Sequence, residues 1–260
     1  LLDYLRSKRM VLILDNFEHL LTPKAYAVNV IREILDTAPA IKILVTSRVR
    51  LNIQAEHLYA IQGLSLPQQD GGTPSLENAQ ATDAVQLREY GAIQLFLWNM
   101  QRVQASITPS DRDLSHIIRI CKFLQGMPLA ILLAASWTRM LFPAEIEAQL
   151  LGTLTDTSHD TTTRSDALDF LTTDRLDLPV GQRSMRAVFD HSWQLLAAQE
   201  RQILAALSVF RGGFTYEAAQ RVCSATLHSL VSLVDQSLLH RTASGRYELH
   251  DLLWHYAREK

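Results

Sequence analysis

Residues 11–15 read VLILD and residues 41–46 read IKILVT. Both stretches are nearly continuous apolar runs, without the alternation of apolar and polar residues that a half-exposed strand shows. Continuous runs of this length are typical of strands that are covered on both faces in a parallel sheet. The two runs therefore predict neighbouring parallel strands in an α/β fold.

The residues between the two runs predict a helix. Apolar side chains recur there at the spacing of one helix face, at Ala25, Val28, Ile31 and Leu35. Pro23 suits the first turn of such a helix. Strand, helix and strand in this order form one βαβ unit, which is nearly always right-handed. We expect a third short strand at residues 57–61.

The middle of the chain predicts a small helical bundle. A polar stretch rich in Gly and Pro at residues 67–83 predicts a linker. Helical periodicity then occurs at residues 90–104, 111–124, 128–140 and 143–151. Gly126 can close the second of these helices as a C-cap, and Pro128 can open the third.

The C-terminal part predicts a winged-helix module. Helical patterns occupy residues 186–196, 198–207, 215–223 and 227–236. Two short strands are predicted at residues 238–241 and 246–249, flanking residues 242–245 (TASG), a hairpin signal with Gly in the turn. Residues 250–259 predict a closing amphipathic helix. The predicted fold is thus a partial parallel α/β sheet followed by an α-helical bundle and a winged-helix domain, with helices dominating. The predicted boundaries are 1–66 for the α/β part, 67–88 for a linker, 89–152 for the bundle, 153–181 for a second linker and 182–260 for the winged helix.

Composition excludes several classes of protein. The net charge of the 260 residues is −2 and the basic residues are scattered, so the chain lacks the basic stripe of a nucleic-acid-binding surface. Cys121 and Cys223 are far apart in the sequence and have no metal-ligand spacing around them, so we expect neither a disulfide-stabilised fold nor a zinc site. The longest apolar run, residues 129–135, is too short to span a bilayer. We expect a cytoplasmic protein that does not enter a membrane.

The ends of the two predicted strands carry the candidate chemistry. Asp15 and Arg48 each follow a strand, and ligands of parallel sheets bind beyond the carboxyl ends of the strands. An acid and a cation at one edge suit a metal-bound polyphosphate, with Mg²⁺ on Asp15 and a terminal phosphate on Arg48. Thr46 and Ser47 add hydroxyl groups nearby. The alternative is that Asp15 caps a turn and Arg48 is a solvated loop residue.

Five segments, in the same order, resemble the STAND-class signalling ATPases (NB-ARC relatives), and most of all those of large bacterial regulators of the LuxR and SARP types. The matching segments are VLILDNFEHL (11–20) for Walker B, LVTSR (44–48) for the sensor, GMPLAI (126–131) for the GLPLA motif, LSVFRGGF (207–214) for the start of the winged helix, and YELHD (247–251) for the MHD segment. The resemblance covers essentially the whole chain. It implies that residues 1–66 are the C-terminal part of a P-loop ATPase domain.

The resemblance also implies roles for individual residues. Asp15 would be the acid that organises Mg²⁺, and Arg48 would contact the γ-phosphate of ATP. Pro128 would touch the adenine, and His250 would face the β-phosphate of bound ADP. Asn16 stands where many relatives have a second catalytic acid, and because an amide cannot accept a proton as a carboxylate does, we expect hydrolysis to be slow at most.

Two further departures concern the motifs. Leu249 replaces the Met of the MHD segment. A P-loop reads G-x-x-x-x-G-K-[ST], and none of the five lysines of this chain follows a glycine. The chain also begins with Leu1 rather than Met, so we expect it to be part of a longer protein. Residues 1–260 alone should then bind ATP negligibly, and one edge of the IKILVT strand should be exposed.

Three functions are compatible with these patterns. The first is a regulatory switch that is closed with ADP and opens with ATP, with adenine nucleotide, the P-loop half, sensor repeats of the same protein and self-association as expected partners. The second is DNA binding by the winged helix, which is disfavoured because its recognition helix at residues 227–236 contains no Lys or Arg. The third is an interaction scaffold with an inactive nucleotide site.

Overall fold

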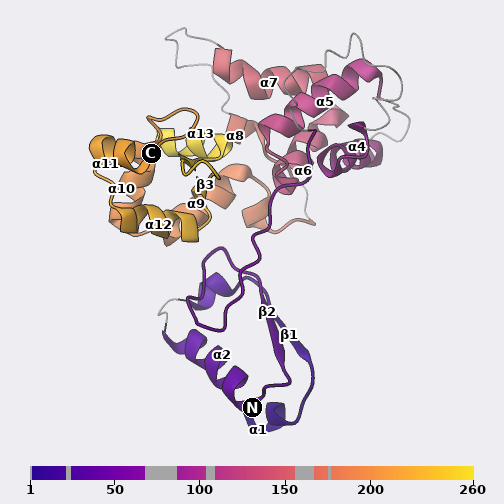
Figure 1. Cartoon of the computed structure of the whole chain (residues 1–260). Coiled ribbons are helices and arrows are strands. Elements are labelled where there is room, and N and C mark those ends of the chain that lie inside the picture. The colour runs from indigo at the N-terminus through magenta and orange to yellow at the C-terminus, as the bar shows by residue number, and fades with distance from the viewer. Residues whose placement is uncertain (1, 22–24, 68–86, 104–108, 156–166, 175–176) are drawn as a thin grey trace. The chain divides into compact units, whose positions relative to one another are not determined.

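The computed structural model describes residues 2–21, 25–67, 87–103, 109–155, 167–174 and 177–260 (Figure 1). The chain separates into two compact units. The first combines Leu1–Ala60 with Gly212–Glu248, and the second combines Ile61–Arg211 with Leu249–Lys260.

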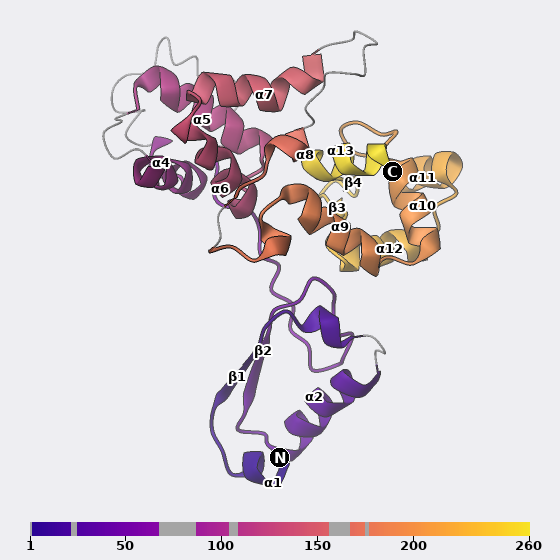
Figure 2. The same ribbon diagram turned by 180° about the vertical axis from the view of Figure 1, so that it is seen from behind.

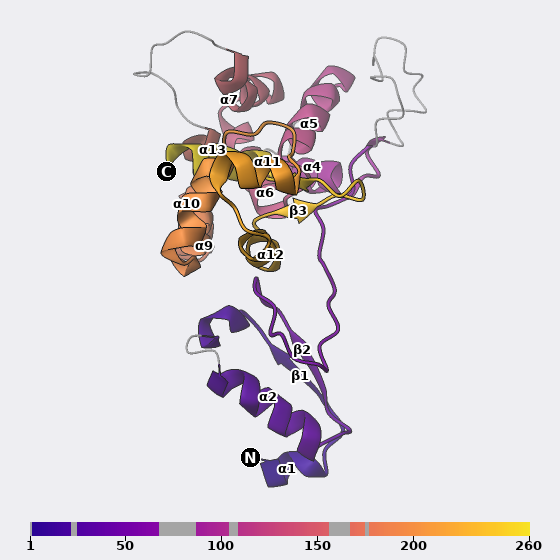
Figure 3. The ribbon, with the colours of Figure 1, turned by 60° about the vertical axis from the view of Figure 1, so that its left-hand side comes forward.

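The first unit contains the predicted βαβ arrangement. Strands β1 (Val11–Leu14) and β2 (Lys42–Val45) pair in parallel, with Leu14 opposite Val45. Helix α2 (Ala25–Thr37) connects them, after the short helix η1 (Phe17–Leu20), and α1 (Leu2–Arg6) precedes β1. Figure 3 shows α2 lying along the β1–β2 pair. The prediction of two parallel strands with a helical crossover is therefore confirmed.

Only one face of this strand pair is covered within residues 2–60. Leu12 and Ile43 pack against a buried cluster made by α1, α2 and the start of β2. On the other face, Val11, Ile13 and Leu44 are 59%, 67% and 56% exposed. The prediction that both faces are covered is wrong for the described residues. Successive side chains of a strand point to opposite faces of the sheet, so each face needs its own packing partner. An apolar run makes burial of both faces possible without supplying the second partner.

The predicted third strand is also absent. Residues 57–61 lie outside any helix or strand, and Tyr59 and Ile61 are 90% and 87% exposed. The chain after β2 turns instead, because the Glu56 carboxylate accepts hydrogen bonds from the backbone N–H groups of Leu51 and Asn52 at 3.0 and 2.9 Å.

The C-terminal segment of the first unit holds two helices and a hairpin. Helices α11 (Tyr216–Cys223) and α12 (Leu227–Asp235) are followed by the antiparallel strands β3 (His240–Arg241) and β4 (Tyr247–Glu248). Gly245 has a φ of +81° in the connecting turn, a value that glycine adopts without strain. The hairpin prediction is confirmed, with shorter strands than expected.

The second unit contains the predicted helical bundle. Its helices are α4 (Gly91–Val103), α5 (Asp111–Phe123), α6 (Pro128–Ser136), the short η2 (Trp137–Arg139) and α7 (Pro143–Thr155). Helix α4 packs on α6, and α5 packs on α7 (Figure 2). Fully buried side chains, among them Phe96, Leu114 and Ile131, form the core that holds these helices together.

The second unit also includes α8 (Ala167–Phe170), η3 (Val180–Gln182), α9 (Met185–Leu195), α10 (Ala198–Leu207) and α13 (Asp251–Glu259). Helix α10 packs on α13, and the Tyr256 hydroxyl of α13 donates a hydrogen bond of 2.6 Å to Asp190 of α9. No helix in the described ranges has both the length and the apolar character needed to cross a membrane. The winged-helix assignment and the five domain boundaries stay predictions.

Candidate functional site

The carboxyl ends of β1 and β2 are joined by hydrogen bonds through Thr46. The Thr46 N–H donates to the Leu14 carbonyl at 3.0 Å, and the Thr46 hydroxyl donates to the Asp15 carboxylate. The same hydroxyl oxygen accepts from the backbone N–H of Asn16 at 3.0 Å, and the Thr46 carbonyl accepts from the N–H of Phe17 at 3.0 Å. Parallel pairing thus brings Asp15 and Thr46 together at one edge, in keeping with the prediction that the Thr46 hydroxyl lies near Asp15.

Asn16 shapes this edge through its backbone. Its φ of 58° and ψ of 43° are left-handed, a conformation that Asn tolerates better than most residues. The turn it makes sends the chain into η1 and leaves the Asp15 side chain exposed. A carboxylate that is exposed and oriented by a neighbouring hydroxyl suits Mg²⁺, which takes one or two carboxylates and keeps phosphate oxygens and water as its other ligands.

Ser47 and Arg48, the next two residues of the sensor segment, contact other residues of the first unit. The Ser47 hydroxyl donates to the Val49 carbonyl at 2.8 Å and accepts from the Val49 N–H at 3.1 Å. The Nε atom of Arg48 lies 3.6 Å from an oxygen of Glu18, whose side chain is 3% exposed. Glu18 was missed by sequence reasoning, because a helix as short as η1 has no periodicity from which burial could be inferred.

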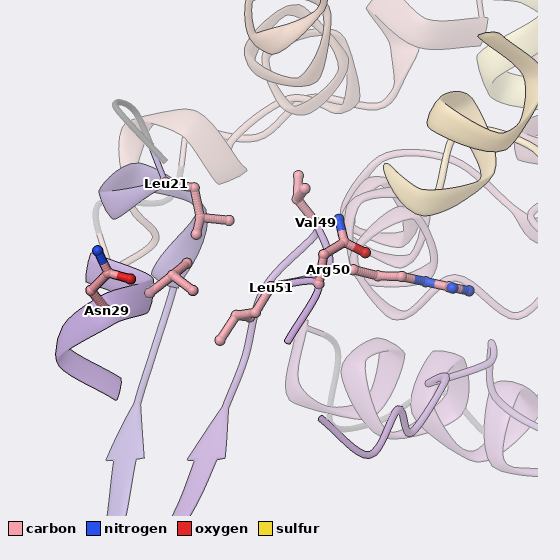
Figure 4. A pocket seen from close by; sticks show the side chains of 7 residues that line it. Leu21, Asn29, Val49, Arg50 and Leu51 are labelled. Carbon is pink, nitrogen blue, oxygen red and sulfur yellow. The ribbon is translucent and has the colours of Figure 1, made fainter. Parts of the chain in front are cut away.

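A cavity of about 240 Å³ lies beside this edge (Figure 4). It is lined by Leu21, Val28, Asn29, Val49, Arg50, Leu51 and Asn52. The Nε atom of Arg50 lies 3.0 Å from the Asp235 carboxylate, which forms a salt bridge with it. With four aliphatic side chains in its wall, this cavity suits an apolar group better than a phosphate.

In the second unit, the GMPLA segment forms a tight turn between α5 and α6. Gln125 and Gly126 both have positive φ values, 49° and 70°, and Pro128 occupies the first turn of α6. The Gly126 carbonyl accepts a hydrogen bond of 2.8 Å from the Leu64 N–H. A Cβ atom on Gly126 would lie 2.3 Å from the Leu64 carbonyl oxygen, and one on Gly63 would lie 2.4 Å from the Gln125 carbonyl oxygen. Residues 63–64 therefore lie directly against this turn, which no sequence pattern indicated.

His250 caps the N-terminus of α13 close to the same turn. Its Nδ1 atom accepts a hydrogen bond of 3.1 Å from the Leu252 N–H, so the neutral ring carries its proton on Nε2. That Nε2 atom is buried and has no hydrogen-bond partner among the described residues. Next to it in sequence, Asp251 accepts a hydrogen bond of 3.1 Å from the Gln125 side chain. The YELHD segment thus reaches the turn that begins the GMPLA segment.

The protonation of His250 is governed mainly by burial. Burial lowers its pKa below the ordinary value of 6.5, against smaller opposing effects of the Asp251 charge and the Leu124 carbonyl. By the stricter geometry of distance and angle, Nε2 makes no hydrogen bond to the Leu124 carbonyl. The neutral ring with a proton on Nε2 is consequently the form present at neutral pH.

This lowered pKa predicts a pH-dependent stability. Between the folded pKa of His250 and 6.5, the unfolded chain binds more protons than the folded chain, so the free energy of unfolding should fall as the pH drops through about 6.5 and level off below the folded pKa. Burial also lowers the pKa of His255, which adds to the same trend. Thermal unfolding followed by tryptophan fluorescence between about pH 5 and pH 7.5 measures it.

His250→Asn is the matched control for that measurement. Asn keeps an N-cap acceptor for the Leu252 N–H but does not titrate. The variant should therefore show a shallower loss of stability at low pH, with the contribution of His255 remaining. An unchanged pH dependence would show that His250 is not the group responsible.

The predicted site residues fall into two groups, one in each unit. Asp15, Asn16 and Thr46 lie together, with Ser47 and Arg48 on the adjoining loop, whereas His250 lies at the turn that leads to Pro128. The described residues contain no group of three or more His, Cys, Asp or Glu side chains that could hold a metal ion. A magnesium site at Asp15 would thus depend on oxygen ligands from phosphate and water.

Comparison with known proteins relates the chain to bacterial regulators. It is 28% identical over 267 residues to a protein of Mycobacterium tuberculosis that is provisionally named an HTH-type transcriptional regulator, and a Mycobacterium bovis protein of the same description matches equally. The match covers 99% of this chain and 26% of those proteins, so the chain spans about a quarter of their length. An uncharacterised M. tuberculosis protein is 28% identical over 280 residues, which cover 59% of it.

Among solved structures, the chain matches a STAND protein (Signal Transduction ATPase with Numerous Domains) from Pyrococcus horikoshii that carries a tetratricopeptide repeat sensor. That match is 16% identical and covers 99% of this chain and 29% of the other, with a TM-score of 0.28 that is too low to support an argument from structure. No protein-family model matches the chain. The sequence comparisons thus show similarity to proteins that are named as bacterial transcriptional regulators, over about a quarter of their length.

Proposed function

We propose that this chain is the nucleotide-reading part of a STAND-class regulatory switch, which binds ADP or ATP with Mg²⁺ and controls transcription through domains outside residues 1–260. The observation that carries the proposal is the arrangement at the carboxyl edge of β1 and β2. There an exposed carboxylate, Asp15, is oriented by the Thr46 hydroxyl where parallel sheets bind their ligands. The resemblance of the surrounding segments to Walker B and sensor motifs supports the same role.

In this proposal Asp15 and Thr46 serve the metal ion and the phosphates. Asp15 holds Mg²⁺, directly or through water, and Thr46 keeps the carboxylate in place by donating its hydroxyl proton to it. Bound Mg²⁺ would neutralise charge on the phosphate oxygens. Asn16 offers an amide where a general base would be needed, so ATP hydrolysis is slow. The bound nucleotide then sets the state of the switch and does not drive continuous work.

Pro128 and His250 are the residues that we propose to contact the base and the diphosphate. Pro128 is exposed at the start of α6 and can lie against the adenine ring. His250 presents an Nε2–H donor, because its Nδ1 atom already accepts a bond from the backbone. A buried donor that lacks a protein acceptor in the described structure is suited to an anionic oxygen, such as a β-phosphate oxygen of ADP.

DNA binding by this region remains the weaker proposal. Helix α12 has the sequence LHSLVSLVD, which contains no Lys or Arg and ends in Asp235. Phosphate contacts to DNA come mainly from basic side chains. The regulator names of the relatives then fit a DNA-binding domain elsewhere in a longer protein better than they fit α12.

Nucleotide titration of the complete protein tests the proposal. Calorimetry with ATP and with ADP, each with and without Mg²⁺, should show binding that Mg²⁺ strengthens. Arg48→Ala should weaken ATP binding by about tenfold, the effect of losing roughly one charge-assisted hydrogen bond, and should leave ADP binding within about twofold. A scaffold with an inactive site predicts no binding of either nucleotide, and that result would replace the present proposal.

A further inference from the structure

Residues 63–65, the strap, lie against the GMPLA turn of the second unit in one register. The Leu64 N–H donates a hydrogen bond of 2.8 Å to the Gly126 carbonyl. Each segment has a glycine where the other approaches: a Cβ atom on Gly63 would lie 2.4 Å from the Gln125 carbonyl oxygen, and one on Gly126 would lie 2.3 Å from the Leu64 carbonyl oxygen. A shift of the strap by one residue would bring a side chain into this space. The strap therefore holds the turn in one place.

Ser65 fastens the strap to the helical bundle. Its hydroxyl accepts a hydrogen bond of 2.9 Å from the Gly91 N–H, and its carbonyl accepts one of 3.2 Å from the Ala92 N–H. These donors lie at the start of α4, where backbone N–H groups find no partner within their own helix. Ser65 thus acts as an N-cap for a helix that begins 26 residues further along the chain. One side chain connects the strap, and through it the GMPLA turn, to α4.

This connection bears on Pro128, the residue that we propose to touch the adenine. Pro128 follows Gly126 by two positions and its ring fixes its own φ, so the place of the ring depends on the turn that the strap holds. Gly63, Ser65 and Pro128 are all exposed, so the connection lies at the surface of the second unit and not in its core. A turn that is already ordered lowers the entropy cost of binding a ligand there.

We propose that Ser65 is a positioning residue for Pro128: through the strap it fixes the place of the proline ring, and so determines how tightly the base of a nucleotide binds. This inference rests on the function proposed above. Without the hydroxyl, the Gly91 N–H loses its acceptor and the strap keeps only one of its two hydrogen bonds to α4. The turn before Pro128 then has more freedom in the unbound protein, and every ligand that carries the base must order it again.

Ser65→Ala in the complete protein tests this inference by calorimetry. The affinities for Mg²⁺–ATP and Mg²⁺–ADP should both fall by about fivefold, which corresponds to about 1 kcal/mol. Inorganic tripolyphosphate with Mg²⁺ carries three linked phosphates and no base, and its affinity should stay within about twofold of the wild-type value. Ser65→Thr keeps a hydroxyl acceptor for the Gly91 N–H and should restore the affinity for ATP.

Ser110→Ala is the matched control for the loss of an N-cap serine. The Ser110 hydroxyl accepts a hydrogen bond of 3.2 Å from the Asp113 N–H at the start of α5, whereas the GMPLA turn follows the other end of that helix. Ser110→Ala should therefore lower the thermal unfolding midpoint about as much as Ser65→Ala does. It should leave the affinities for ATP and ADP unchanged.

The outcomes separate this inference from the proposed function. Equal losses of ATP and tripolyphosphate affinity in Ser65→Ala show a general loss of structure and contradict the positioning of Pro128. An ATP affinity of Ser65→Ala equal to that of the wild type contradicts it too, as does the same loss in Ser110→Ala. In these cases the nucleotide site stands. No binding of ATP or ADP by the wild type contradicts the proposed function, and the role of Ser65 with it.

Discussion

Gly126→Ala should destabilise the second unit by roughly 3–4 kcal/mol, at the upper end of what single substitutions usually cost, because it combines steric conflict with backbone strain. Gly126 has a φ of 70°, which costs an L-residue about 1–2 kcal/mol. Its new Cβ atom would also lie 2.3 Å from the carbonyl oxygen and 2.9 Å from the nitrogen of Leu64. Neither backbone atom can move without breaking the hydrogen bond from the Leu64 N–H to the Gly126 carbonyl.

Urea unfolding followed by tryptophan fluorescence reports the stability of the second unit, in which Gly126 lies. All four tryptophans, Trp98, Trp137, Trp193 and Trp254, belong to the second unit. The midpoint of the transition should fall, with little change in its slope if the unit still unfolds in one step.

Two other glycines of the same unit separate the causes. Gly63→Ala adds a Cβ atom 2.4 Å from the Gln125 carbonyl oxygen at a position without a positive φ, and so isolates the steric conflict. Gly181→Ala meets no atom within 4 Å and should change the stability by no more than about 0.5 kcal/mol. If Gly126→Ala were as mild as Gly181→Ala, residues 63–64 would not lie against the GMPLA turn.

Asp15→Asn should lower the affinity of the complete protein for Mg²⁺–ATP by about 100-fold, which corresponds to about 2.8 kcal/mol. The physical reason is that an amide oxygen carries no net charge and is a much weaker ligand for Mg²⁺ than a carboxylate. The Asn side chain can still accept the hydrogen bond that the Thr46 hydroxyl donates to Asp15, so the edge of the sheet should keep its geometry.

Titration with ATP in the presence and absence of Mg²⁺ separates loss of the metal from loss of the fold. The affinity should fall with Mg²⁺ present and change little in its absence, and the thermal unfolding midpoint should stay close to that of the wild type. Asp36→Asn, on the exposed side of α2, is the matched control. A Mg²⁺ dependence that survives in Asp15→Asn would remove Asp15 from the metal site.

Local patterns were sufficient for most of the regular elements. The run at residues 11–14 became β1, the helical stripe that starts after Pro23 became α2, and the TASG turn joined β3 to β4. These predictions succeeded because strand runs, helix periodicity and turn glycines each depend on interactions within a few residues. The prediction for residues 57–61 failed because a strand also needs a partner, and in the described residues no strand lies beside this segment.

The sequence by itself determined the candidate chemistry at the edge of the sheet. Asp15 and Thr46 had to meet there, because parallel strands place their carboxyl ends side by side. Only the tertiary structure decided that Glu18 is buried beside Arg48, that residues 63–64 lie on the GMPLA turn, and that His250 keeps an unpaired Nε2 atom in the described structure. Those features arise from contacts between segments far apart in the chain, and burial of a polar atom depends on everything packed around it, which no local pattern records.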